Sequence, residues 1–239
     1  MLLEQALQIL LSAFPNTFVF FGGASLVLFY GSPRHSGDLD LLINAETAPS
    51  AAAVQRALEG PLRADGEILG YRRLTVEPAR TVGEFTKLIA RDGARVLFTI
   101  DLTRISAVIR GELVEFPIPS DSGEHMFVQV PSPNLQLLFK AEAFLRRPFL
   151  QARDAFDIKL LQDSGAVLSD SLKVHLVDGP AAEKLGNPGF IAERIAQVNS
   201  RTCKHALQPY LPKDVFDELA RSDFEPLRSA LRSLFAKWL

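Results

Sequence analysis

Two glycines and two aspartates, set between apolar segments near the N-terminus, restrict the fold of this chain more than any other feature. An apolar run ends in Gly22 and Gly23, and a second apolar run carries Asp38 and Asp40 in the order Asp-Leu-Asp-Leu. The pattern predicts a strand, a short helix over residues 25–30 and a second strand. Because side chains two apart on a strand point to one face, we expect the two carboxylates to lie together.

Carboxylates held this close repel each other unless a cation lies between them. Oxygen ligands favour a hard divalent ion, which predicts Mg2+, two ions in all, with Mn2+ as a substitute. The backbone N–H groups of Gly22 and Gly23 at the start of a helix suit a phosphate. The pattern therefore indicates a nucleotide site with a nucleoside triphosphate as substrate, although an ordinary turn followed by an exposed strand edge is the structural alternative.

The composition sets wider limits. The chain has 239 residues, 47% of them hydrophobic and 23% charged, which is typical of a globular protein of one large or two small domains. A single cysteine, Cys203, excludes an internal disulfide and a cysteine-based metal site. No apolar run is long enough to span a membrane, so we expect no membrane partner and a cytoplasmic location. The net charge of −2 gives no general attraction to nucleic acid.

The hydrophobic pattern changes once along the chain. Residues 1–130 are predicted to form an α/β domain, with helices over residues 2–14 and 48–58 and strands joined by short, hence antiparallel, connections. The predicted later strands of this domain are residues 68–76, 85–90, 95–103, 107–116 and 127–130. A Pro-Ser-Pro sequence at residues 131–133 marks the border, and residues 131–239 are predicted to form a helical domain in which Ser132 caps the first helix.

A third carboxylate is expected in phosphoryl transfer that uses two metal ions. Asp101 is the best candidate because it lies in the apolar run Val96–Leu102, where an ionised side chain is costly unless it is paired or bound to a metal. The alternative is that the strand ends there and Asp101 faces water.

Two predicted helices of the second domain add further charged candidates. Lys140 stands in an otherwise apolar helix, and Asp154 and Asp157 share one face of the next helix, over residues 149–162. Lys140 and an aspartate could pair with each other, or they could line a cleft that faces the triphosphate. Arg34 and Ser36, in the loop before the aspartates, are candidate phosphate contacts, and the arginine pairs 72–73 and 146–147 are candidate contacts to nucleic acid.

These motifs resemble the DNA polymerase β-type nucleotidyltransferase superfamily and, more narrowly, its AbiEii/AbiGii abortive-infection toxin group. The group has a glycine pair, Tyr-Gly, Arg-x-Ser and Asp-Leu-Asp, then a helical lysine and Arg-Asp-x-x-Asp. The corresponding segments here are Gly22-Gly23, Tyr30-Gly31, Arg34-His35-Ser36, Asp38-Leu39-Asp40, Lys140 and Arg153-Asp154-Ala155-Phe156-Asp157. The chain departs from the group where Ala24-Ser25 replaces Thr-Ala, so Ser25 is the candidate for the hydroxyl.

The resemblance implies a polymerase β-type domain with a mixed or antiparallel sheet, followed by helices. It implies that Asp38 and Asp40 hold metal, that the glycines fix the triphosphate, and that Lys140, oriented by Asp154, neutralises phosphate charge. Asp101 is assigned from the residues themselves, as a third metal ligand that also assists the acceptor hydroxyl. It also implies a toxin of a two-gene system with a cognate antitoxin and an RNA acceptor, transfer RNA first. A small-molecule or protein acceptor, and an inactive binding module of the same fold, remain as alternatives.

Overall fold

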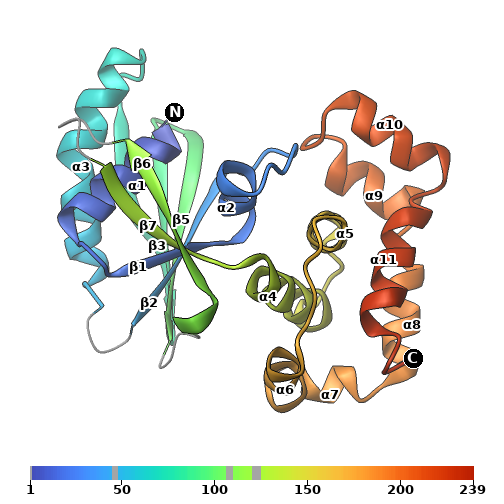
Figure 1. Cartoon of the computed structure of the whole chain (residues 1–239). Helices are drawn as coiled ribbons and strands as arrows, with labels where there is room; N and C mark the ends of the chain where they lie inside the picture. The colour runs from blue at the N-terminus through green and yellow to red at the C-terminus, as the bar shows by residue number, and fades with distance from the viewer. Residues whose placement is uncertain (1, 45–47, 106–109, 120–124) are drawn as a thin grey trace. The chain divides into compact units, whose positions relative to one another are not determined.

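The computed structural model describes residues 2–44, 48–105, 110–119 and 125–239. The chain divides into two compact units (Figure 1): unit 1 comprises Met1–Ser25 and Ser36–Pro131, and unit 2 comprises Leu26–His35 and Ser132–Leu239. These units differ from the predicted division at residue 130 mainly in the segment 26–35, which belongs with the C-terminal helices.

A mixed sheet forms the framework of unit 1. Within the described residues it has seven strands in the order β3-β4-β5-β2-β1-β7-β6. The β2–β5 and β1–β7 pairs are parallel, and the other neighbours are antiparallel, as predicted for the strands with short connections. The strands are β1 (Phe18–Phe21), β2 (Asp38–Asn44), β3 (Leu74–Val82), β4 (Phe85–Asp92), β5 (Arg95–Ile105), β6 (Leu113–Pro119) and β7 (His125–Pro131).

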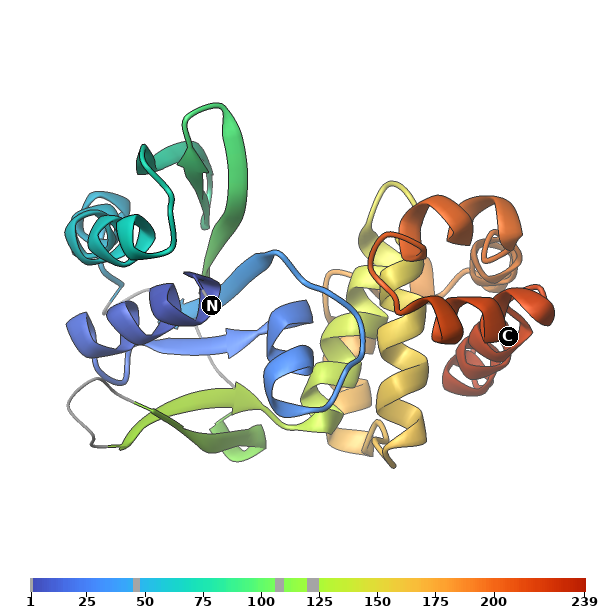
Figure 2. The ribbon, with the colours of Figure 1, turned by 90° about the horizontal axis from the view of Figure 1, so that it is seen from above.

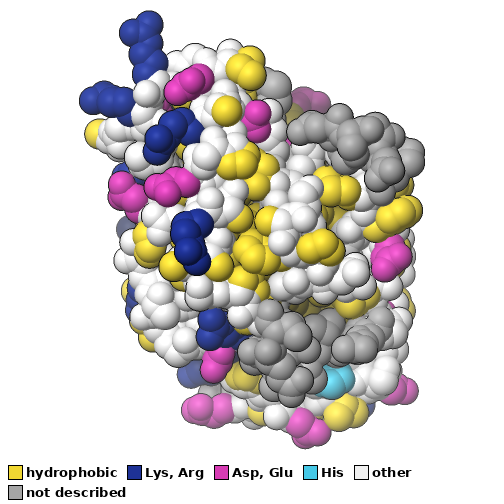
Figure 3. Space-filling view, turned by 90° about the vertical axis from the view of Figure 1, so that its left-hand side faces the viewer, with side chains coloured by type: hydrophobic (Ala, Val, Ile, Leu, Met, Phe, Trp, Pro, Cys, Tyr) yellow, Lys and Arg dark blue, Asp and Glu magenta, His cyan; other side chains and the backbone are white. Residues whose placement is uncertain are grey.

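Two helices, α1 (Leu2–Ala13) and α3 (Ala51–Ile68), cover one face of this sheet (Figure 2). They pack on each other, α1 also contacts β2 and β7, and α3 contacts β3 and β4. The alternate residues Leu39, Leu41 and Ile43 of β2 are buried on this side. Figure 3 shows one face of the molecule as a space-filling view. Hydrophobic side chains gather in the middle of this face, and charged side chains lie mainly towards its margin.

The third helix is longer than the sequence predicted. It begins at Ala51, where Ser50 accepts a hydrogen bond from the Ala53 N–H, and continues through Pro61 to Ile68. The missing N–H of a proline weakens a helix, but a buried stripe at a spacing of four residues (Val54, Leu58, Leu62 and Gly66) runs across it. The strand predicted from residue 68 therefore starts only at Leu74. Part of the strand predicted over residues 107–116 lies outside the described residues, and β6 begins at Leu113.

Unit 2 is helical, as predicted. Ser132 caps its first long helix by accepting a hydrogen bond from the Leu135 N–H. Its interior includes the rings of Phe144 and Phe235, stacked with centroids 5.8 Å apart. The helices are α4 (Pro133–Arg146), α5 (Ala152–Asp163), α6 (Asp170–Asp178), α7 (Ala182–Leu185), α8 (Pro188–Ala196), α9 (Ser200–Leu207), α10 (Lys213–Arg221) and α11 (Glu225–Phe235).

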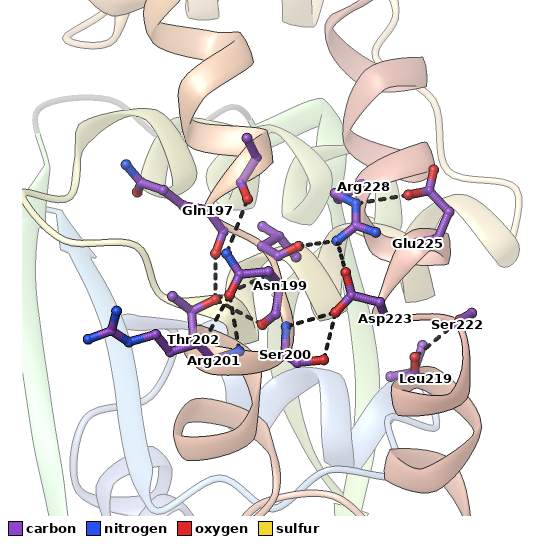
Figure 4. A network of polar contacts seen from close by, with 12 residues as sticks. Gln197, Asn199, Ser200, Arg201, Thr202, Leu219, Ser222, Asp223, Glu225 and Arg228 are labelled. Atoms are coloured by element: carbon purple, nitrogen blue, oxygen red, sulfur yellow. Dashed lines mark hydrogen bonds and ion pairs between the residues drawn. The ribbon is translucent and has the colours of Figure 1, made fainter.

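A polar network joins the starts of α9 and α11 (Figure 4). Asn199 caps α9 by accepting hydrogen bonds from two backbone N–H groups, and the Asp223 carboxylate accepts from the backbone N–H and the hydroxyl of Ser200. Arg228 of α11 pairs with Asp223 at 3.3 Å and donates to the Val198 carbonyl at 2.6 Å. These contacts fix the turn between α10 and α11 against α9.

None of the helices in the described part of the chain is both long enough and apolar enough to cross a membrane.

Candidate active site

The side of β2 opposite α1 and α3 carries the two predicted carboxylates. Asp38 and Asp40 are half-buried, whereas Leu39 and Leu41 between and beyond them are fully buried on the other side. The parallel register of β2 and β5 pairs Asp40 with Asp101, so the third predicted carboxylate lies on the neighbouring strand beside the second. The expectation that Asp38 and Asp40 share a strand face is met by the structure.

Gly22 begins α2 (Gly22–Phe29) and lies directly against Asp40. Its φ of +77° is in the region that favours glycine, and a Cβ at this position would be 2.1 Å from Oδ2 of Asp40. The Ser25 hydroxyl is buried and donates to the Gly22 carbonyl at 2.9 Å. The structure thus gives Gly22 a steric role, and the phosphate contacts predicted for Gly22, Gly23 and Ser25 stay predictions.

Lys87 of β4 is a member of this site that the sequence analysis missed. Its Nζ lies 2.7 Å from Oδ1 of Asp101 and donates to the Thr99 hydroxyl at 3.2 Å. The Thr99 hydroxyl in turn donates to Oδ1 of Asp38 at 2.7 Å. Burial raises the pKa of Asp101, the nearby charge of Asp38 adds to this, and the hydrogen bond and charge of Lys87 oppose it. The ammonium group of Lys87 therefore neutralises part of the negative charge of the neighbouring aspartates.

The carboxylates of this site are the side chains that would bind the predicted metal ion. Within the described ranges, no three or more histidine, cysteine, aspartate or glutamate side chains converge as a ready-made metal site. Asp38 and Asp40 supply carboxylate oxygens on one face and fit a hard divalent ion. Asp101 lies beside them but is paired with Lys87, so its predicted metal role requires that ion pair to open.

A second charged cluster lies inside unit 2, around Asp157. Asp157 is fully buried and accepts two hydrogen bonds from the Arg34 guanidinium, at 2.6 and 2.8 Å. Nζ of Lys140 lies 2.8 Å from Asp157 and 3.7 Å from Asp154. Arg147 approaches Asp154 at 3.2 Å. Two aspartates and three cations thus form one network, in which Arg147 is exposed and the other four side chains are buried.

The two aspartates of this network differ in their electrostatics. Burial acts to raise the pKa of Asp157, but the charges of Lys140 and Arg34 and their hydrogen bonds prevail, and its pKa is lowered. Burial raises the pKa of Asp154 and outweighs the charges of Lys140 and Arg147. Asp157 is therefore the firmly ionised partner of Lys140, whereas the sequence predicts Asp154 as the residue that orients this lysine.

The other residues predicted to contact the nucleotide lie in both units. The Arg34 guanidinium is 4% exposed and donates to Asp157 and to the His35 carbonyl. Its ion pair with Asp157 is the structural alternative to the predicted phosphate contact. Ser36 is half-exposed in unit 1. Lys140 and Arg34 belong to unit 2 and the carboxylates of β2 to unit 1, and a nucleotide cleft that joins them stays a prediction.

No curated protein sequence matches the chain. The protein JHP933 from Helicobacter pylori is similar in structure, with a TM-score of 0.53 and 15% identity over 98% of this chain and 91% of that one. A second H. pylori protein, described as a candidate nucleotidyltransferase, gives a TM-score of 0.52 and 14% identity over 99% of this chain and 94% of that one. At these identities the likeness shows a shared fold.

The family is shown by a sequence profile. The profile of the family described as "Nucleotidyl transferase AbiEii toxin, Type IV TA system" matches residues 5–237, which is nearly the whole chain. This match confirms the resemblance read from the glycine pair, the Asp-Leu-Asp segment and the later lysine. The chain therefore belongs to the AbiEii family of nucleotidyltransferase toxins.

Proposed function

We propose that this protein transfers a nucleoside monophosphate from a Mg2+-bound nucleoside triphosphate to a hydroxyl of an RNA. Transfer RNA is the acceptor that we favour. It would act in the cytoplasm, where both substrates are found, and a cognate antitoxin would restrain it. The observation that carries the proposal is the face of the sheet opposite α1 and α3, where Asp40 lies beside Asp101 and against Gly22 and Asp38 is on the same strand face. The family's description as a toxin of a type IV toxin–antitoxin system supports the antitoxin.

The reaction assigns roles to the residues of the site. Asp38 and Asp40 would hold the metal ions, and when bound these supply the positive charge that stabilises the attacking and leaving oxygens. The acceptor hydroxyl loses its proton and forms a bond to the α-phosphorus, while the bond to the bridging oxygen breaks and pyrophosphate leaves. Asp101, freed from Lys87, would take that proton, and the raised pKa that burial gives it supports this role.

The charged network of unit 2 would serve the phosphates. Lys140 is held by Asp157 and Asp154 with its ammonium buried, so its position is set before any substrate binds. A positioned cation stabilises charge that develops on a leaving pyrophosphate better than a mobile one. The Gly22 and Gly23 N–H groups at the start of α2 would bind the triphosphate.

The test is a labelling assay with each α-labelled nucleoside triphosphate, total cellular RNA and Mg2+ or Mn2+. We expect wild-type protein to label RNA only with a divalent ion, and Asp38→Asn or Asp40→Asn to reduce labelling at least 100-fold with the fold retained. Either variant relieves repulsion between like charges, so its melting temperature should hold or rise. Near-normal labelling by these variants would reject the metal assignment. Absence of RNA labelling by wild type with all four nucleotides would reject the RNA acceptor.

A further inference from the structure

Four arginines gather at one end of the sheet of unit 1 and form what we call the arginine cluster: Arg72, Arg73, Arg91 and Arg95. Arg72 and Arg73 directly precede β3, Arg91 lies near the end of β4 and Arg95 is the first residue of β5. The register pairs Asp92 with both Leu74 and Arg95, which brings the end of β4 between the starts of β3 and β5. The four residues thus lie at the same end of three adjacent strands, with Arg95 on the face of Asp92 and Arg91 on the opposite face.

The cluster carries unbalanced positive charge. Within the described part of the chain, none of the four guanidinium groups makes an ion pair or a hydrogen bond. Asp92 is the acidic residue nearest in register, and its carboxylate accepts from the backbone N–H of Arg73 at 2.8 Å instead. Arg72, Arg73 and Arg95 are exposed. Like charges in this number repel each other, and a bound anion relieves the repulsion.

One member of the cluster lies close to the backbone of a turn. The guanidinium of Arg73 lies over the β4–β5 turn, with its atoms 3.0 to 3.3 Å from the position that a Cβ on Gly93 would occupy. Gly93 has a φ of +59°, and the absence of its side chain lets the planar group approach the turn closely. The planar guanidinium is itself pre-organised, so little conformational freedom is lost for each hydrogen bond that it forms to a ligand.

We propose that the arginine cluster binds the phosphate backbone of the RNA acceptor, an inference that rests on the proposed function. Arginine presents a rigid fork of donors that matches a phosphate, and several such contacts along a surface suit a polyanion. Tyr71, half-exposed and adjacent to Arg72, is placed to stack on a base.

The cluster also lies at a useful distance from the carboxylates of the same unit. Arg95 and Asp101 are six residues apart on β5, and about 3.3 Å per residue gives roughly 20 Å along the strand. An RNA whose reactive hydroxyl is at Asp38 and Asp40 could therefore extend back over several nucleotides to reach the cluster. The cluster would hold the body of the acceptor while the carboxylates act on its end.

The test compares two double variants that remove the same charge. R72Q/R95Q removes two exposed members of the cluster and keeps Arg73 on its turn, whereas R56Q/R63Q removes two exposed arginines of α3 and is the control. Binding of labelled unfractionated transfer RNA is measured by fluorescence anisotropy, without nucleotide and over a range of salt concentrations. Thermal melts check that both variants are folded.

We expect R72Q/R95Q to weaken binding about 10-fold or more and to reduce the slope of log K against log salt by about 1.5, since each lost phosphate contact contributes about 0.7 to 0.9. The control should change both values much less. At limiting RNA, labelling by R72Q/R95Q should show a raised KM for RNA with kcat unchanged.

The outcomes separate this inference from the proposed function. If wild type labels RNA but the cluster variant and the control behave alike, the cluster is not the RNA surface and the proposed function stands. If wild type labels no RNA with any nucleotide, the proposed RNA acceptor is rejected, and this inference is rejected with it. If poly-L-glutamate displaces the RNA as readily as an RNA competitor of equal charge, the cluster is a surface for acidic proteins and the inference is overturned.

Discussion

At the scale of single residues, Gly22 shows how one position can limit a site. Its positive φ and its contact with Asp40 both exclude a side chain, but for different reasons: the first is a backbone preference and the second is lack of space. A substitution here therefore tests whether the carboxylate of Asp40 must lie against the turn.

We predict that Gly22→Ala destabilises the protein by about 2 to 4 kcal/mol, because the strain of a positive φ adds to a clash with Oδ2 of Asp40. Gly83→Ala is the matched control, since Gly83 has a φ of +55° and no atom within 4 Å of its Cβ position. Chemical denaturation of both variants measures the difference. The double variant Gly22→Ala/Asp40→Ala should recover part of the loss, and simple additivity would contradict the clash.

Asp157 gives a residue-scale prediction for pH. Its pKa is lowered in the folded state, so the unfolded state binds the proton more tightly and ionised Asp157 stabilises the fold. That stabilisation is fully present above the unfolded pKa of about 4 and is lost as the pH falls through the lower folded value. Asp154, whose pKa is raised, has the opposite sign and is relieved by acid.

We therefore predict that the stability difference between wild type and Asp157→Asn is largest above about pH 5 and shrinks towards pH 2, as measured by urea denaturation at each pH. Asp214→Asn, at an exposed position of α10, is the control and should follow wild type throughout. A stability difference that grows on acidification would show that Asp157 is not the ionised partner of Arg34 and Lys140.

At the scale of elements, a bulge decides which side chains meet on the open face of the sheet. Strands β4 and β5 pair Arg91 with Val96 but Ala90 with Phe98, so one residue of β5 is skipped. Without the bulge, Lys87 would pair with Ile100, which faces the helices. The skipped residue moves the partner of Lys87 to Asp101 and places its ammonium among the carboxylates.

We predict that Lys87→Gln binds Mn2+ about 5-fold more tightly than wild type, because a positive charge that competes for Asp101 is removed. The ion pair is partly exposed, with side chains 30% and 19% accessible, so the effect should be of this modest size. Paramagnetic titration of the nucleotide-free protein measures it, and Lys173→Gln, from an exposed pair of α6, is the control. Unchanged or weaker Mn2+ binding would show that Lys87 does not compete with the metal.

At the scale of the whole molecule, the two units are not two consecutive stretches of sequence. Residues 26–35 leave unit 1 and complete unit 2, where Arg34 pairs with Asp157 and the His35 N–H donates to the Tyr210 carbonyl at 2.7 Å. The helices from residue 132 onward therefore depend on contacts with a segment that lies about a hundred residues earlier in the sequence.

We predict that a fragment of residues 132–239 is unstable by itself, since Asp157 would be buried with one of its cations missing, a change that typically costs about 3 to 5 kcal/mol. A peptide of residues 22–37 added in trans should raise the melting temperature of the fragment, and the same peptide with Arg34→Leu should not. Circular dichroism measures both. Full stability of the bare fragment would show that the segment is dispensable.

The sequence by itself determined the features that depend on neighbouring residues. Alternation of apolar and acidic residues placed Asp38 and Asp40 on one face, the capping serine at residue 132 marked the start of the helices, and the motif spacing identified the family. These signals are local, because strand and helix periodicity fix the direction of a side chain over a few residues.

Tertiary structure alone decided the partners that lie far apart in sequence. The parallel register set Asp101 beside Asp40, the bulge brought in Lys87, and Arg34 met Asp157 across 123 residues. Pro61 did not end α3, because the buried stripe that packs on the sheet outweighs one lost hydrogen bond. Register, bulges and long-range ion pairs depend on how whole elements pack, and no local pattern in the chain carries that information.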